Sequence, residues 1–243
     1  MKKMILFKED YMSKIGIIGA MDEEVTLLKK SMHGVKATVK AGMIFAEGTL
    51  WGKETVVVVS GIGKVNMAVC AQMLIDLFGV DTLINTGVAG SLDAKIDIGD
   101  IVISTEAQQH DMDVSALGDP VGIIPRMKDS IFKADEKLVD IAYKACKKAN
   151  PDINCFKGKV VSGDQFIASR DKKDFLKAYF KGMCAEMEGG SMAQVAYLNE
   201  IPFVIIRAIS DKADDSGHMD YPVFAKGAIK HSVALLEEMY KSI

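Results

Sequence analysis

Residues 203–215, with the sequence FVIIRAISDKADD, constrain the fold more than any other part of the chain. The first half is apolar and rich in β-branched side chains, which is typical of a strand buried on both faces at the centre of an α/β sheet. The apolar run ends at Ser210. Because ligands bind beyond the carboxyl ends of strands in such sheets, we expect Arg207 and Asp211 to face a substrate. Taken alone, the segment also fits a simpler interpretation, in which Asp211 caps the next element.

The rest of the chain alternates between patterns typical of strands and of helices. We expect two or three strands within residues 35–59, further strands at 14–20, 81–87, 99–104, 155–162 and 183–185, and helices at 21–32, 64–78, 135–149, 171–180, 189–199 and 221–240. This alternation predicts one α/β domain over residues 13–243, with a central mixed, mostly parallel sheet surrounded by helices. Residues 1–12 are expected to form an N-terminal extension outside the domain.

Composition narrows the class of partner. The 243 residues are 49% hydrophobic and carry a net charge of −3, so no basic surface indicates a nucleic acid or an anionic membrane. No apolar run approaches the ~18 residues that span a bilayer, and the apolar run near the N-terminus is too short for a signal peptide. The four cysteines are scattered without a CxxC pair, which favours reduced thiols in a cytoplasmic protein.

Acidic side chains follow three of the predicted strands, and one of them is Asp211, described above. Glu23 and Glu24 open a helix, where acids complement the helix dipole, yet Glu24 lies where the turn opens toward the crevice. Glu186 and Glu188 flank Met187 and would point to one face of an extended segment. Two like charges so close need partners or a function, such as accepting the vicinal hydroxyls of a ribose. Alternatively, one acid is exposed and the other caps the following helix.

Two further segments carry weaker signals. Residues 61–64 (GIGK) open a helix and could bind an anion, but Asn66 replaces the third glycine of a dinucleotide fingerprint and no P-loop is present, so a tight turn without phosphate is the simpler interpretation. Residues 108–125 lack periodicity, as loops with a functional or interface role often do. Their His110, Asp111 and Asp113 match neither a zinc spacing nor a calcium loop, so we expect no metal and no organic cofactor.

Six blocks in order carry a resemblance to a known family. They are KIGIIGAMDEEV (14–25), SGIGKVN (60–66), INTGVAG (84–90), VSGDQFI (161–167), EMEG (186–189) and FVIIRAISDKAD (203–214). Together they resemble the 5′-methylthioadenosine/S-adenosylhomocysteine nucleosidases of the nucleoside phosphorylase superfamily. The resemblance implies a nucleoside phosphorylase-like fold and a homodimer. It also implies hydrolysis of the N-glycosidic bond of both nucleosides, with release of adenine, in methionine salvage.

The resemblance also implies roles for individual residues. Glu24 is expected to be the base that activates water, and Asp211 the acid that protonates adenine N7. Glu188 is expected to accept the 2′- and 3′-hydroxyls of ribose. Further substrate contacts are implied for Ile62, Gly90, Phe166, Ile167, Met187, Arg207 and Tyr221, and a pocket shared with the partner subunit for Val114, Leu117 and Pro125. Val88 departs from a frequent serine, which puts the holding of the water in question, and Leu117 departs from a frequent aromatic, which leaves the preferred 5′-alkylthio group open.

The chemistry explains why such groups are needed. Adenine is a poor leaving group as an anion, so Asp211 must donate a proton, and burial would raise its pKa from the usual ~3.9. Glu24 and Glu188 would favour the cationic sugar, and general base catalysis by Glu24 would contribute ~10²–10⁴-fold.

Three other functions are less consistent with these residues. A phosphorylase needs a cationic anion site, whereas the first turn after the first strand offers acids and Arg207 would be partly neutralised by Glu24. A non-catalytic nucleoside-binding protein would need Glu188 and Phe166 but neither Glu24 nor Asp211. A nucleotide-dependent oxidoreductase would carry a dinucleotide-binding fingerprint, which this sequence lacks.

Overall fold

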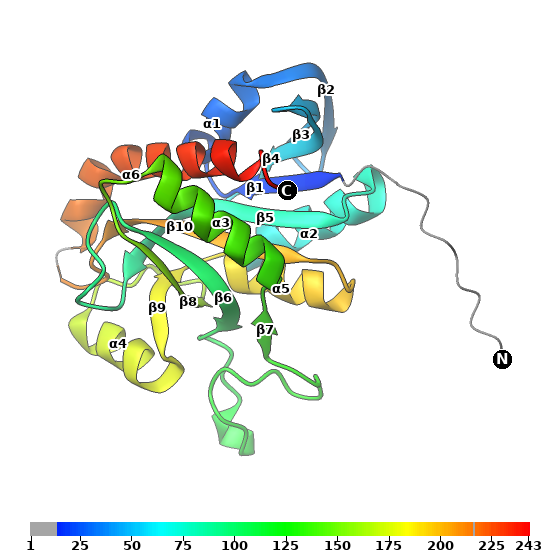
Figure 1. The fold of residues 1–243 in the computed structure, drawn as a ribbon. Coiled ribbons are helices and arrows are strands. Elements are labelled where there is room, and N and C mark those ends of the chain that lie inside the picture. The colour runs from blue at the N-terminus through cyan, green and yellow to red at the C-terminus, as the bar shows by residue number, and fades with distance from the viewer. Residues whose placement is uncertain (1–13, 216) are drawn as a thin grey trace.

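The computed structural model describes residues 14–215 and 217–243, except for the side chains of residues 217–222. The predicted extension, residues 1–12, therefore lies outside the described residues. Within the described residues, ten strands form one sheet (Figure 1). They are β1 (Ile15–Gly19), β2 (Met32–Lys40), β3 (Met43–Leu50), β4 (Lys53–Val59), β5 (Thr82–Ser91), β6 (Ile101–Gln109), β7 (Ile131–Lys133), β8 (Cys155–Ser162), β9 (Gly182–Glu186) and β10 (Phe203–Asp211).

The sheet contains both parallel and antiparallel pairs, in the order β10-β6-β8-β9-β5-β1-β4-β3-β2, and β7 pairs with β6. β1 runs parallel to β4 and β5, whereas the hairpins β2-β3 and β3-β4 are antiparallel. β10 pairs in parallel with β5 and antiparallel with β6, so the sheet closes on itself. This mixed sheet confirms the predicted α/β class. Every residue of β10 is buried, which confirms its predicted central position.

Helices cover both faces of the sheet. α3 and α6 pack against each other on the near face in Figure 1, and α2 packs against α5 behind the sheet. α3 begins after Asp135, whose carboxylate accepts the Leu138 N–H and caps the helix as acids commonly do. The helices are α1 (Asp22–Lys30), α2 (Lys64–Phe78), α3 (Glu136–Ala149), α4 (Arg170–Phe175), α5 (Gly189–Leu198) and α6 (Gly217–Met239), with a 3-10 turn η1 (Ser115–Leu117) and a π-helical turn η2 (Leu176–Phe180).

The structure differs from the predicted elements in several places: β5 extends to Ser91, α6 begins at Gly217, and β7 was not predicted. The first helix ends at Lys30, and Met32 instead begins β2, where it pairs with Leu50 of β3. β6 extends to Gln109, into the segment predicted to be a loop, because residues 106–109 pair with β8. Strand pairing over a long sequence separation overrides local periodicity at Met32 and at residues 106–109. The other predicted elements agree with the structure within a few residues.

Candidate active site

A cavity of about 550 Å³ lies where several strands end. Its walls come from the segments that follow β1, β4, β8 and β9 and from the last residues of β5 and β10, as expected for a ligand site of an α/β sheet. The lining residues are Ala20, Met21, Glu24, Ile62, Val88, Ala89, Gly90, Phe166, Ala185, Glu186, Met187, Glu188, Ser210 and Asp211. Seven of the residues predicted from the sequence therefore meet in one cavity.

Glu24 lies in the first turn of α1 and is only 4% exposed. Its Oε2 accepts the backbone N–H groups of Ala20 and Met21, at 2.6 and 3.0 Å, and its Oε1 accepts the Val88 N–H at 3.2 Å. Burial raises the pKa of Glu24, while Arg207 and the three amides oppose that rise. A buried carboxylate with a raised pKa, fixed by backbone donors, is well suited to accept a proton. Val88, which stands where the family often has serine, thus contacts Glu24 through its backbone N–H.

Asp211 is the last residue of β10 and is 2% exposed. Its Oδ1 accepts the Ala213 N–H at 2.8 Å, and its Oδ2 accepts the Ser210 hydroxyl at 2.9 Å. The carboxylate lies against Gly90 of the parallel strand β5, where an added methyl group would lie 2.7 Å from Oδ1. The contact with the Ala213 N–H is a local turn contact, as expected if Asp211 caps the next element. The same carboxyl group also lines the cavity.

Arg207 does not line the cavity, although the resemblance implied that it contacts the substrate region. It is 1% exposed, and its guanidinium donates to the carboxylate of Glu186 and to the side-chain oxygen of Asn85. Burial alone would raise the pKa of Glu186, but Arg207 and the Ser162 hydroxyl lower it overall. Arg207 thus neutralises Glu186 directly behind the cavity wall.

The two acids around Met187 have different surroundings, and both are buried, so the alternative with one exposed acid is wrong. Glu186 accepts the backbone N–H groups of Glu188 and Gly189 and thereby caps α5. Glu188 stands at the N-cap position, but its Oε1 accepts the Gly63 N–H at 2.8 Å. Burial and the charge of Glu186 raise the pKa of Glu188 to about 7.

Apolar side chains form the rest of the cavity. Phe166 and Ile62 are 51% and 54% exposed and lie at its mouth, whereas Met187 is half-buried. Ile167 is buried and lines a small adjoining cavity together with Gly90 and Asp211. A broad apolar cleft with carboxylates at fixed points suits a flat heterocycle joined to a polar sugar.

The remaining predicted site residues lie elsewhere. Leu117 is 85% exposed, Pro125 is exposed, and Val114 is half-buried. They belong to the segment between β6 and β7, drawn in green, which projects from the body of the molecule (Figure 1). None of the three lines the cavity of this single chain. Tyr221 belongs to α6, but its side chain lies outside the described residues.

Charge in the cavity has one sign. Its charged lining residues are Glu24, Glu186, Glu188 and Asp211, and no lysine, arginine or histidine joins them among the described residues. Within the same part of the chain, no group of three or more His, Cys, Asp or Glu side chains is arranged to hold a metal ion. Asp111 instead pairs with Lys64, and Asp113 accepts the Ser115 N–H.

Sequence reasoning missed the connections of several residues around the site. It left Glu186 with open alternatives and did not single out Asn85 or Ser162, whose polar side chains hold Arg207 and Glu186 in place. A signal was present for both residues, since Asn85 is a polar residue inside the apolar run of β5 and Ser162 is the last residue of β8. No helix among the described residues is long and apolar enough to cross a membrane.

Comparisons with known proteins identify relatives of this chain. The sequence profile of the phosphorylase superfamily matches residues 14–241. A 5′-methylthioadenosine/S-adenosylhomocysteine nucleosidase of Halalkalibacterium halodurans is 42% identical over 226 residues, which cover 93% of this chain and 96% of the relative.

Two solved structures superpose closely on this chain. The nucleosidase of the same name from Neisseria meningitidis, in complex with methylthio-immucillin-A, has a TM-score of 0.90 at 37% identity and covers 95% of this chain and 100% of its own. The futalosine hydrolase of Helicobacter pylori has a TM-score of 0.89 at 34% identity, with 96% and 99% covered.

Proposed function

The chain belongs to the phosphorylase superfamily and, within it, to the 5′-methylthioadenosine/S-adenosylhomocysteine nucleosidases, and from that membership we propose that it hydrolyses the N-glycosidic bond of both nucleosides. The products would be adenine and the 5-thio-substituted ribose, as methionine salvage requires. The observation that carries the proposal is the cavity in which Glu24, Glu188 and Asp211 converge beside an apolar cleft.

Each acid would have a distinct task. Asp211 would donate a proton to N7, so that adenine departs as a neutral base. Glu24 would accept a proton from the attacking water, and its raised pKa supports that task. Glu188 would accept the two ribose hydroxyls. Phe166 would stack on the base and the backbone of Ile167 would bind it, with Met187 and Ile62 beside the ribose.

Water, rather than phosphate, is the proposed nucleophile. A phosphorylase must attract an anion, and the described residues of the cavity wall carry only acids. Arg207, which lies outside the cavity lining, is engaged by Glu186 and Asn85. An inorganic phosphate at this position would face net repulsion from Glu24 and Glu188.

A homodimer is part of the proposal. α2 exposes Val65 and Val69, at 74% and 38%, and Leu198 at the end of α5 is 63% exposed. Together with the projecting loop that carries Leu117, these side chains leave apolar surface uncovered on a single chain. A partner would bury this surface and receive Val114, Leu117 and Pro125 against its own cavity. The proposed setting is the cytoplasm, where both nucleosides arise.

The direct test is adenine release from 5′-methylthioadenosine, measured with and without inorganic phosphate while the sugar product is identified. Free 5-methylthioribose, formed at a rate indifferent to phosphate, is the expected outcome. A phosphate requirement with a sugar 1-phosphate product would make the protein a phosphorylase. Binding without adenine release would make it a nucleoside-binding protein. Parallel assays with S-adenosylhomocysteine, deoxyadenosine and futalosine would define the substrate range.

A further inference from the structure

An ion pair just outside the cavity joins three segments that are separate in the sequence. Lys64 begins α2, directly after the glycine turn, and its Nζ lies 2.6 Å from Oδ1 of Asp111 at the start of the projecting loop. Both side chains are largely buried, with exposed fractions of 18% and 13%. A second acceptor, Oε1 of Gln109, lies 3.1 Å from the same Nζ. The ammonium group is therefore held from one side by the end of β6.

The third segment is the turn that precedes Phe166. Oδ2 of Asp111 accepts the Asp164 N–H at 2.8 Å, and Oδ1 of Asp164 accepts the Lys64 N–H at 2.8 Å. Lys64, Asp111 and Asp164 thus form a closed ring of contacts. The carboxylate of Asp111 accepts the Lys64 ammonium group and one backbone N–H, and the carboxylate of Asp164 accepts the second backbone N–H, so each carboxylate has a donor.

The ring leads directly to the cavity through Gly63. Gly63 precedes Lys64, and its N–H donates to Oε1 of Glu188 at 2.8 Å. Its φ of +98° is one that only glycine adopts without strain, and an added methyl group would lie 3.1 Å from Oδ1 of Asp164. The direction of the Gly63 N–H therefore depends on how the Lys64 backbone is held. Ile62, one residue earlier, lines the cavity.

We propose that the Lys64–Asp111 ion pair, completed by Asp164, is a positioning device that fixes the glycine turn against the base-binding turn and so sets the affinity for the nucleoside. This inference rests on the proposed function of the cavity. Neither charged side chain lines the cavity, so both act through others: Gly63 on the ribose side, and Phe166 on the base side. The same ion pair anchors the projecting loop that carries Leu117. The position of this loop would therefore also depend on the Lys64–Asp111 pair.

Loss of the ion pair should affect binding more than chemistry. The donors to Glu24 and Asp211 described above lie before α1, in β5, at the end of β10 and after β10, and none of these donors belongs to the ring. Glu188 would lose its donor if Gly63 turned away. Substrate binding would weaken, while the proton transfers would keep their geometry.

A change in pH dependence would separate positioning from a general loss of structure. The groups that act on Glu188 are Glu186 and Glu24, which raise its pKa, and Arg207 and the Gly63 N–H, which lower it. Loss of the Gly63 contact would remove one of the lowering influences. The acidic limb of kcat/KM should then move to higher pH, whereas partial unfolding would lower the profile without moving it.

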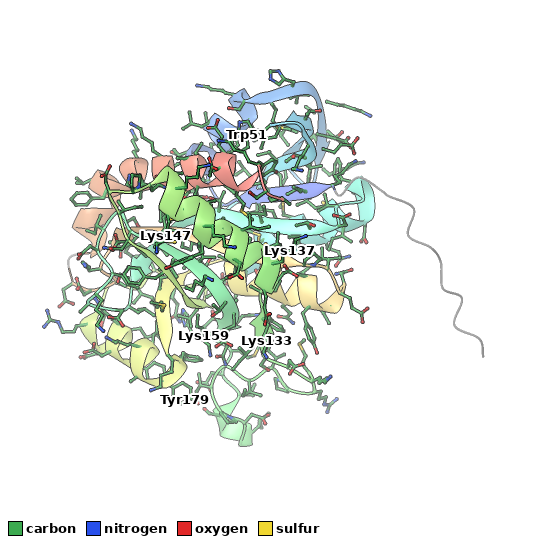
Figure 2. The ribbon with its side chains drawn as sticks, in the orientation of Figure 1. Trp51, Lys133, Lys137, Lys147, Lys159 and Tyr179 are labelled. Carbon is green, nitrogen blue, oxygen red and sulfur yellow. The ribbon has the colours of Figure 1, made fainter. Side chains whose placement is uncertain are left out.

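The experiment compares Lys64→Met and Asp111→Asn with a matched control, Lys159→Met. Lys159 on β8 is labelled in Figure 2 and forms a pair of similar burial with Glu106, at 3.0 Å, outside the cavity lining. We measure KM and kcat for 5′-methylthioadenosine, the pH profile of kcat/KM, the dissociation constant of adenine and the melting temperature. Lys64→Arg, which keeps the charge, serves as the rescue variant.

The expected result is a KM raised roughly tenfold or more in both variants, a kcat within a few-fold of wild type, and an acidic limb moved upward. Lys64→Arg should restore most of the affinity, and Lys159→Met should match the wild type. An unchanged KM in Asp111→Asn would overturn the proposal. The proposal would also be overturned if Lys64→Met, Asp111→Asn and Lys159→Met all showed the same lower kcat, higher KM and lower melting temperature.

Failure of the function itself would look different. If wild-type protein releases no adenine, the proposed activity is wrong, and the device is then judged by the adenine dissociation constants alone. Weaker adenine binding in Lys64→Met and Asp111→Asn than in Lys159→Met would still support it. Equal dissociation constants in all variants, or no adenine binding by the wild type, would reject it.

Discussion

At the scale of single residues, the cavity gives neighbouring carboxyl groups different protonation behaviour. Burial raises the pKa values of Glu24 and Glu188, whereas Arg207 holds that of Glu186 low despite burial. Glu186 thus stays charged and serves structure, as the cap of α5 and the partner of Arg207. Glu188, with a pKa of about 7, is left able to exchange protons near neutral pH, and burial raises the pKa of Glu24 above its ordinary value. Separation of this kind is the pattern expected where carboxylates share one site but differ in role.

Glu24→Gln and Asp211→Asn should each abolish turnover and leave the fold intact. Both substitutions keep the size of the side chain, and the remaining oxygen can accept the N–H groups of Ala20 and Met21, or that of Ala213, so that only the longer contact of Glu24 with the Val88 N–H is lost. They remove the ability to take or give a proton, which removes at least ~10²-fold from the rate. Adenine release measures the loss, and circular dichroism checks the fold. Wild-type rates in either variant would refute the role assigned to that residue.

Glu188→Gln should stabilise the protein at alkaline pH while impairing binding. The folded pKa of Glu188 is raised to about 7, so its contribution to stability is present below its ordinary pKa and is lost as the pH rises through 7. The neutral variant avoids the burial of charge. Its unfolding free energy should exceed that of wild type by on the order of 2 kcal/mol near pH 8, a difference that shrinks toward pH 5.

Denaturant unfolding at the two pH values measures that difference. A Glu188→Gln variant that is less stable than wild type near pH 8 would mean that the carboxylate is not destabilised by burial. A matched KM measurement at the same pH values should show weaker nucleoside binding in the variant, since an amide cannot accept two hydroxyls as a carboxylate can.

At the scale of elements, β5 is the strand on which the two proposed catalytic groups depend. Gly87 pairs with Arg207 and Gly90 with Asp211 across the β5–β10 ladder. A methyl group at Gly87 would lie 2.6 Å from Oε1 of Glu24 and 3.0 Å from a guanidinium nitrogen of Arg207. The strand therefore needs glycines there because side chains from α1 and β10 occupy the space directly above them.

Gly87→Ala should lower kcat by roughly 10²-fold, because Glu24 must leave its position beside the Val88 N–H. Gly227→Ala in α6 is the matched control, since nothing lies within 4 Å of its added methyl group. That change should leave kcat unaltered and raise stability by up to ~1 kcal/mol, since alanine favours helices. Equal activities in the two variants would show that the close approach at Gly87 is unimportant.

At the scale of the whole molecule, the single chain completes the proposed acid and base sites but leaves the projecting loop uncovered. The described cavity wall contains no residue between 110 and 125, and Leu117 is 85% exposed. A second body packed against this loop would bury its exposed apolar side chains. The proposed homodimer would supply that body and close the end of the cavity where the 5′-substituent lies.

Val65→Glu should dissociate such a dimer, because it places a charge on apolar α2 surface that is 74% exposed in the single chain. Light scattering should give twice the chain mass of 26.4 kDa for wild type and a single chain for the variant. KM should rise with dissociation, since the partner's loop no longer covers the cavity. A monomeric wild-type protein with full activity would contradict both expectations.

Much of the fold and of the site could be predicted because the determining signals are local. The apolar run that becomes β10, the turn before α2 and the acid that caps α3 each occupy a short segment with its own periodicity or turn chemistry. The cavity position followed from one rule about the carboxyl ends of strands. The boundaries at Met32 and Gln109 could not be predicted, since pairing with distant strands decides them.

The sequence by itself determined which residues would be buried, which acids would follow strands, and hence where the cavity lies. Only the tertiary structure decided which charges meet. Arg207 lies opposite Gly87 and binds Glu186, and Lys64 reaches Asp111 across 47 positions. The reason is that periodicity follows from neighbouring residues, whereas an ion pair depends on the register of distant strands and on the burial that makes an unpaired charge costly.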